Sequence, residues 1–199
     1  ETGLCVRTIS HPDNWGYACA FSPADDLLAL GGWNAPITVH ELRPNKPLAP
    51  FQLPGDTEKP LSAACASEEV AVVASGKRLA AIRRADNKVL FENDMEAEVS
   101  ARLVPMALPP AGKQVAVCMK DLNAISLRDV RTGQQQHLLS GWQGSLVGVS
   151  YSPDGSLLMV FGDFPTAVYS AASGKQLHSF GDTSIRVFDA CTDPAGKVL

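Results

Sequence analysis

The chain has 199 residues, of which 45% are hydrophobic and 19% are charged, and its formal net charge is −4. This composition supports a globular chain with a large apolar core and excludes a general duplex nucleic-acid binder, which needs a surplus of positive charge. No apolar run approaches the ~20 residues that a membrane-spanning helix requires, so we expect no membrane span.

The predicted elements are short strands, because brief apolar or β-branched runs are separated by turn residues and none has helical length. Some of these runs, such as Val70–Ala74, are apolar throughout, which is typical of sheets covered on both faces. In chain order, we expect strands at Leu4–Ile9, Tyr17–Phe21, Leu27–Leu30, Ile37–Leu42, Pro50–Leu53, Leu61–Ala66, Val70–Ala74, Arg78–Ile82, Lys88–Glu92, Val99–Leu108, Gln114–Met119, Ala124–Leu127, Gln135–Leu139, Leu146–Tyr151, Leu157–Phe161, Thr166–Tyr169, Gln176–Phe180 and Ile185–Ala190.

The turns between these strands repeat at a fixed interval. Ser22-Pro23-Ala24-Asp25 lies 130 positions before Ser152-Pro153-Asp154-Gly155, and Thr132-Gly133 lies 41 positions before Ser173-Gly174. If the longer interval holds three units, each unit has roughly 43 residues, within the range of about 40 to 45 that four-stranded propeller blades need. The sequence therefore predicts a repeat array.

We expect an all-β fold, a β-propeller of four-stranded antiparallel blades, with about four complete blades and part of a fifth. Residues 1–199 would form a single, partial propeller with approximate units 2–43, 44–85, 86–131, 132–171 and 172–199. The remaining blades are expected in a longer parent chain. The alternative is a five-bladed ring completed by a partner strand.

The order of elements within a unit resembles the WD-repeat β-propeller family. An outer strand is followed by a loop with His11, an inner strand ending in a turn such as Ser152-Pro153-Asp154-Gly155, two further strands and a closing Thr-Gly turn. The family's Trp-Asp and Gly-His pairs are replaced. The positions corresponding to them are His40-Glu41, Arg83, Arg128-Asp129 and Tyr169-Ser170 for the first pair, and Ser10-His11 and Gly141-Trp142 for the second. We therefore expect apolar packing to hold most blades together.

No residue pattern predicts catalysis, a metal site or a cofactor. His137 and His178 are 41 positions apart, and recurrence at the repeat interval indicates a structural role. The run Gly141–Ser145 lacks the serine between glycines of a hydrolase elbow. The five cysteines are scattered without the close spacing of a zinc or redox site, which predicts reduced thiols in an intracellular, cytoplasmic protein. We expect no enzyme; the alternative is a quinoprotein-type or lactonase-type propeller.

The resemblance implies that the loops joining outer to inner strand, and second to third strand, emerge on one face. Trp15, Trp33 and Trp142 fall in such loops. Exposed tryptophans favour protein binding, and the alternative is that each folds back as a plug. The predicted partner-binding residues are Trp15, Trp33, Asn34, Trp142, Asp163 and Asp182.

Charge is expected to divide between the two faces. The acidic residues predicted on the tryptophan face are Asp13, Asp56, Glu58, Asp94, Glu96, Glu98, Asp163 and Asp182. The basic residues predicted on the opposite face are Arg43, Lys46, Arg83, Arg84, Lys88, Arg131 and Lys175. An acidic rim attracts a basic peptide or protein. The sequence predicts a non-catalytic scaffold or recognition module, the alternative being a sensor or structural propeller of a larger signalling protein.

Overall fold

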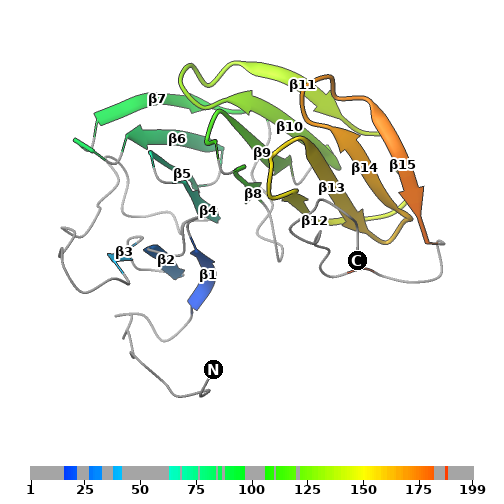
Figure 1. Ribbon diagram of the computed structural model, residues 1–199, viewed down its shortest axis with the longest axis horizontal. Helices are drawn as coiled ribbons and strands as arrows, with labels where there is room; N and C mark the ends of the chain where they lie inside the picture. The colour runs from blue at the N-terminus through cyan, green and yellow to red at the C-terminus, as the bar shows by residue number, and fades with distance from the viewer. Residues whose placement is uncertain are drawn as a thin grey trace.

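The structure is a computed structural model that describes residues 16–21, 27–32, 38–41, 63–67, 69–75, 77–83, 85–86, 88–96, 106–109, 111–119, 122–181 and 187. These residues form fifteen β-strands in four antiparallel sheets, and no helix occurs among them (Figure 1). The predicted all-β class is therefore confirmed for the described part of the chain.

Within each sheet, strands adjacent in sequence are adjacent in space. Sheet I contains β1 (Gly16–Phe21), β2 (Leu27–Gly32) and β3 (Thr38–Glu41). Sheet II contains β4 (Ala63–Ala66), β5 (Val70–Ser75), β6 (Arg78–Arg83) and β7 (Lys88–Asp94). Sheet III contains β8 (Met106–Ala107), β9 (Gln114–Met119), β10 (Ala124–Asp129) and β11 (Gln135–Leu139). Sheet IV contains β12 (Leu146–Tyr151), β13 (Leu157–Gly162), β14 (Thr166–Ser170) and β15 (Gln176–Phe180).

The strand positions agree closely with the sequence predictions. β9, β11, β12 and β15 have the predicted bounds, and most other strands differ by one or two residues at an end. Residues 99–105 of the strand predicted at Val99–Leu108 lie outside the described residues, and β8 covers Met106–Ala107 of the rest. The strands predicted at Leu4–Ile9, Pro50–Leu53 and Ile185–Ala190 lie outside the described residues, apart from Val187.

The sheets are offset by one strand from the sequence units. β7 opens the third predicted unit but pairs with β6 of the second. β11 opens the fourth unit and pairs with β10 of the third. β15 opens the fifth unit and pairs with β14 of the fourth. Each of these sheets therefore takes its outermost strand from the next unit, and this sharing links successive units.

Structural details recur at the intervals seen in the sequence. The pairing of β1 with β2 shifts register between Gly16 and Ala18, and the pairing of β12 with β13 shifts between Leu146 and Gly148, 130 positions later. A second shift affects the outermost strands of three sheets, at Ala81/Ile82, Leu127/Arg128 and Val168/Tyr169. Recurrent bulges indicate that the units repeat in structure as well as in sequence.

The predicted Thr-Gly turn is also a repeated structure. Gly133 N donates to Asp129 O, and Gly174 N donates to Ser170 O, each at 2.9 Å. The φ angles of these glycines are 70° and 65°, a left-handed conformation that glycine adopts without the steric cost of a Cβ atom. The interval between Thr132-Gly133 and Ser173-Gly174 thus reflects two turns of the same kind.

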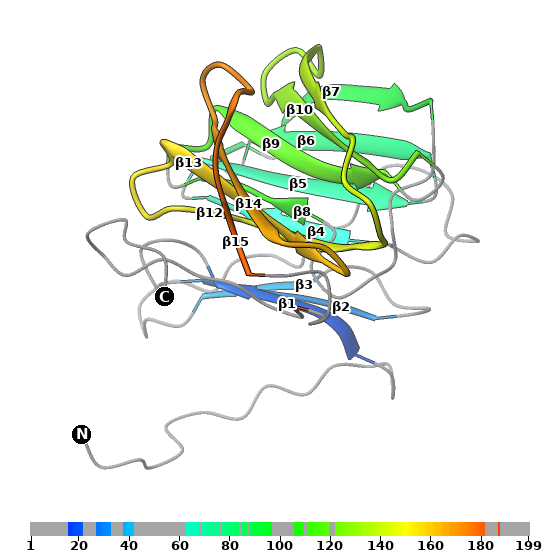
Figure 2. The same cartoon turned by 90° about the vertical axis from the view of Figure 1, so that its right-hand side faces the viewer.

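The four sheets stand beside one another in chain order. β1 contacts β4, β4 contacts β8, and β8 contacts β12, so the first strands of successive sheets are neighbours. Figure 1 shows these strands toward the middle of the molecule, with β7, β11 and β15 at its outside. Seen from the side, sheet I lies below the other three (Figure 2).

Among the described residues, two apolar cores fill spaces between neighbouring sheets. The first lies between sheets II and III and includes Val72, Leu79 and Phe91 from one sheet and Val115 and Val117 from the other. The second lies between sheets III and IV. It includes Cys118, Ile125, Leu127 and Leu139 on one side, and Val149, Leu158, Val160 and Tyr169 on the other. Sheets buried on both faces explain why their strand sequences are apolar nearly throughout.

Candidate functional site

Three connections meet at one end of sheets III and IV, which we call the loop end. They are the β9–β10 turn, the β11–β12 loop and the β13–β14 turn. Asn123 joins the first two, because its Nδ2 donates to Gly144 O at 2.7 Å and its Oδ1 accepts from Leu146 N at 2.9 Å. Asp163 N donates to Ser145 O at 3.0 Å and joins the third. A continuous surface of three connections results.

Trp142 is the aromatic centre of the loop end. Its ring stacks on Phe164, with ring centroids 5.4 Å apart and an interplanar angle of 19°. Phe164 is buried in the core between sheets III and IV, and Trp142 packs against that core while staying partly exposed. The tryptophan thus closes the end of the core and contributes part of its ring to the surface.

The indole nitrogen of Trp142 has no hydrogen-bond partner among the described residues, although it is buried. A buried donor without an acceptor costs about 1 to 3 kcal/mol. Tryptophans that only pack usually find an acceptor for this group. Within the described part of the chain, the hydrogen bonding of the Trp142 indole is therefore incomplete.

Leu122 adds an exposed apolar side chain to the loop end and was not predicted from the sequence. Its exposed fraction is 49%, and it directly precedes Asn123 in the β9–β10 turn. Asn123 has a φ of 44°, a left-handed conformation that asparagine tolerates better than most residues. The sequence signal for this exposed leucine was the Leu-Asn pair at the tip of a tight turn, because a leucine at that position cannot point into a sheet.

The other predicted binding residues are only partly brought together. Asp163 lies at the loop end, next to Phe164, and is partly buried. Trp15, Trp33, Asn34 and Asp182 lie outside the described residues. Of the predicted set, the structure therefore brings Trp142 and Asp163 to one surface, where Leu122, Asn123 and Phe164 join them.

The opposite ends of these sheets, which we call the turn end, carry the short repeated turns. A side-chain carbon added at Gly155 would meet Pro109, and one added at Gly112 would meet Ser67. Gly155 belongs to the first turn of sheet IV, Pro109 and Gly112 to that of sheet III, and Ser67 to that of sheet II. Those three turns therefore pack against one another. The turn end is thus a second continuous surface.

The predicted separation of charge between the two ends is only partial. Asp94, Glu96 and Asp163 belong to connections of the loop-end type, but so does Lys77 in the β5–β6 turn. The turn end holds the predicted basic residues Arg83, Lys88, Arg131 and Lys175, and also Asp86, Asp129 and Asp154. The prediction overlooked these aspartates because turn-forming carboxylates serve local backbone geometry.

Each of these aspartates is occupied within its own turn. Hydrogen bonds from Arg83 lower the pKa of Asp86 to about 2. Burial would raise the pKa of Asp129, but hydrogen bonds from Thr132 and Arg131 outweigh it and lower the pKa. These carboxylates therefore stay ionised and are committed to local bonds.

The third-strand positions that correspond to Trp-Asp hold a different polar arrangement in sheet III. Arg128 is buried, and its Nε donates to Ser126 Oγ at 2.9 Å. Ser126 Oγ in turn donates to Gln135 Oε1 at 2.7 Å. Side-chain hydrogen bonds therefore supplement apolar packing in this sheet, whereas the sequence predicted that apolar packing holds most blades together.

The described histidines lie at structural positions. His137 Nε2 is 3.1 Å from Ala172 O, across the boundary between sheets III and IV. His178, at the equivalent position of sheet IV, contacts Phe180 with ring centroids 6.0 Å apart. In the described part of the chain, no three His, Cys, Asp or Glu side chains are grouped so that they could hold a metal ion. Burial raises the pKa of the Cys118 thiol and keeps it protonated.

Comparison with known proteins adds no family assignment: no family model matches the chain, and no curated protein matches it significantly. No described helix is long and apolar enough to cross a membrane.

Proposed function

We propose that this chain is a non-catalytic protein-interaction module, built as a β-propeller of four-stranded blades of the WD-repeat type. Its partner would bind at the loop end of sheets III and IV. The observation that carries the proposal is the union of three connections into one surface around Leu122 and Trp142. The repeated turns and the contacts between successive first strands support the propeller architecture.

The loop end has the features of a protein-binding hot spot. Leu122 is half exposed, so covering it would remove apolar area from water. Trp142 is held by Phe164 and loses little conformational entropy on binding, which favours aromatic residues at interfaces. Its unpartnered indole nitrogen favours a binding role over a purely packing one, because a rearrangement on binding can supply an acceptor.

We further propose a protein or peptide with basic groups as the partner. Asp163 lies directly beside the aromatic pair, and opposite charge near an apolar contact increases the rate and the specificity of association. We place the protein in the cytoplasm, because its five cysteines are odd in number and scattered along the sequence, as in proteins of reducing compartments.

The test is affinity capture from an extract of the source cells with the chain and two variants. In the first, Leu122→Ala is combined with Trp142→Ala. The second, Leu138→Ala, is the matched control, since Leu138 has the same exposed fraction of 49% but lies on the outermost strand β11. Circular dichroism and thermal denaturation establish that each variant is folded.

We expect the affinity of the double variant for the partner to fall by about tenfold or more, because two hot-spot side chains are removed. The Leu138→Ala control should retain the partner. If the folded double variant captures the same proteins as the unmodified chain, the loop end is not the binding surface.

A further inference from the structure

Arg128 is a buried arginine that forms no ion pair with any described residue. Only 6% of its surface is exposed. Its Nε donates to Ser126 Oγ at 2.9 Å and its Nη1 donates to Gly133 O at 3.1 Å, both neutral acceptors. Removing a charge from water without a counter-charge costs several kcal/mol. Among the described residues, the guanidinium therefore lacks the anionic partner that its burial ordinarily requires.

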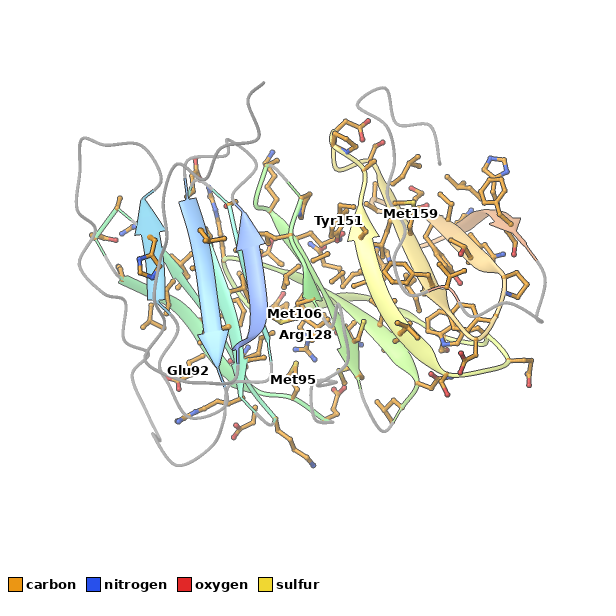
Figure 3. All side chains as sticks on the ribbon, turned by 90° about the horizontal axis from the view of Figure 1, so that it is seen from below. Glu92, Met95, Met106, Arg128, Tyr151 and Met159 are labelled. Atoms are coloured by element: carbon orange, nitrogen blue, oxygen red, sulfur yellow. The ribbon has the colours of Figure 1, made fainter. Side chains whose placement is uncertain are left out.

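The Arg128 side chain faces sheet II. Arg128 is directly opposite Val115 on the neighbouring strand, and Val115 belongs to the core between sheets II and III. Cross-strand neighbours project to the same face of a sheet. Figure 3 shows the arginine in the region between the two sheets, where Met95 and Met106 also lie.

The carboxylates of Asp129 and Glu92 are turned away from Arg128. Asp129 is the next residue along β10 and points to the other face, where it accepts from Arg131 N and Thr132 N. On β7, Glu92 pairs with Arg78 at 2.8 Å and lies apart from Arg128 in Figure 3. These groups therefore do not neutralise the guanidinium.

The polar groups nearest to Gly133 are hydrogen-bond donors. A side-chain carbon at Gly133 would meet Asn93 Nδ2 from sheet II, so this amide reaches the turn that Arg128 contacts. Gln135 uses its Oε1 to accept from Ser126, which leaves its amide nitrogen as a donor. Neither amide nitrogen has an acceptor among the described residues. Guanidinium and amide donors thus converge at the outer rim between sheets II and III.

The donor group is open to solvent. Among the described residues, the only buried side-chain nitrogen or oxygen without a partner is Trp142 Nε1. Arg128 Nη2 also has no hydrogen bond to a described residue. Because it is not one of the buried atoms without a partner, it must be exposed to solvent. A small anion, or an acidic group on another molecule, therefore has access to it.

We infer that Arg128, Asn93 and Gln135 form an oxyanion-binding site at the turn end, between sheets II and III. A guanidinium binds carboxylate and phosphate oxygens through short, charge-assisted hydrogen bonds, and amide donors extend that recognition. The ligand is a group with paired anionic oxygens. This site is independent of the proposed interaction surface, which lies at the opposite end of the sheets.

The test is thermal denaturation of the full chain during titration with inorganic phosphate, at ionic strength held constant with chloride. Ligand that binds only the folded protein raises the Tm with a concentration dependence that yields Kd. We expect Arg128→Gln to weaken phosphate binding by about tenfold or more, as loss of a charged hydrogen bond implies. Arg131→Gln is the charge-matched control, since Arg131 is exposed on the same turn, and it should change Kd by less than about twofold.

A second variant keeps the test valid if Arg128→Gln does not fold. Asn93→Asp has nearly the same shape and places a carboxylate at the turn that Arg128 contacts. It should raise the Tm in the absence of phosphate and abolish the response to phosphate. A phosphate response retained in folded Asn93→Asp or Arg128→Gln would mean an adventitious ion only, and no response in the unmodified chain would equally overturn the inference.

The source of the oxyanion is distinguished by a parallel titration with acetate. A response to acetate as well as phosphate identifies a carboxylate-compatible site, such as one for an aspartate or glutamate side chain. A response to phosphate alone identifies a phosphate group as the ligand. Both results support the site, provided that Arg128→Gln removes them.

Discussion

Asp154 stabilises the turn between β12 and β13 through its own side chain. Its Oδ1 accepts from Ser152 Oγ at 2.5 Å and from Ser156 N at 3.0 Å, and its Oδ2 accepts from Ser156 Oγ at 2.7 Å. These bonds, that of Ser152 first, lower the pKa of Asp154 from 3.8 to about 2. Because the folded-state pKa is depressed, the stabilisation is complete above about pH 4 and is lost as the pH falls toward 2.

We therefore predict that Asp154→Asn lowers the Tm at pH 7 and that the difference from the unmodified chain narrows progressively between pH 4 and pH 2. Thermal denaturation across this range measures it. Asp94→Asn is the control, because Asp94 is exposed and its carboxylate makes no hydrogen bond to the described residues. A Tm difference for Asp154→Asn that stays constant down to pH 2 would exclude the carboxylate as its cause.

Gly144 allows the loop end to assemble. Its φ is 131°, and a side-chain carbon there would meet the carbonyl oxygen of Asp163. Gly141 in the same loop also has a positive φ, 103°, but a side-chain carbon there would meet no atom within 4 Å. Alanine substitution of Gly141 therefore measures the cost of backbone strain, and alanine substitution of Gly144 adds the cost of a steric clash.

We predict that Gly141→Ala lowers the free energy of unfolding by about 1 to 3 kcal/mol through strain alone. Gly144→Ala should cost more and should also disturb the Trp142 environment. Chemical denaturation with tryptophan fluorescence reports both quantities. Equal losses of unfolding free energy for the two variants would mean that the β11–β12 loop and the β13–β14 turn do not pack as closely as described.

At the residue scale, the sequence predicted three loop tryptophans as binding residues, of which Trp142 lies among the described residues, but it did not predict the neighbours of Trp142. Trp142 was recognisable because an aromatic residue between glycines stands out in a loop. Leu122 and Phe164 have side chains that resemble ordinary core residues in sequence. Only the meeting of three connections shows that one is exposed and the other buried.

At the scale of elements, equivalent outermost strands differ in burial. Leu139 on β11 and Phe180 on β15 are 41 positions apart and end their strands in the same way. Leu139 is 4% exposed because sheet IV covers it, whereas Phe180 is 46% exposed. Packing between sheets, not position in the repeat, decides which of the two contributes to stability.

We predict that Leu139→Ala lowers the free energy of unfolding by about 2 to 5 kcal/mol, the usual cost of a large-to-small core substitution. Phe180→Ala should cost less than about 1 kcal/mol, as at exposed positions. Urea denaturation of both variants measures the difference. Similar losses would indicate that Phe180 is covered in the native protein.

Strand positions could be predicted because apolar runs and turn residues act locally. Gly155 and Gly174 mark turns by their left-handed backbone, and the runs between such turns are strands. The assignment of β7 to sheet II could not be predicted from the local pattern, because pairing with β6 depends on contacts across a turn. The bulges that let outermost strands diverge also have no distinctive residue type.

At the scale of the whole molecule, four sheets in chain order produce two ends with different character. Short turns stabilised by their own aspartates form one end, and joined connections with apolar side chains form the other. The distinction follows from antiparallel meanders, in which alternate connections emerge on opposite sides. The proposed binding surface uses the connections of the loop end, and its partner must be identified experimentally.

The most direct measurement of the central claim is site-specific photo-crosslinking in cell extract. A photoreactive phenylalanine derivative would replace Leu122 in one protein and Leu138 in another, since both positions are 49% exposed but only the first lies at the loop end. The account predicts a discrete crosslinked partner from position 122 and none from position 138. Crosslinking to the same partner from position 138 alone, or equally from both, would contradict it.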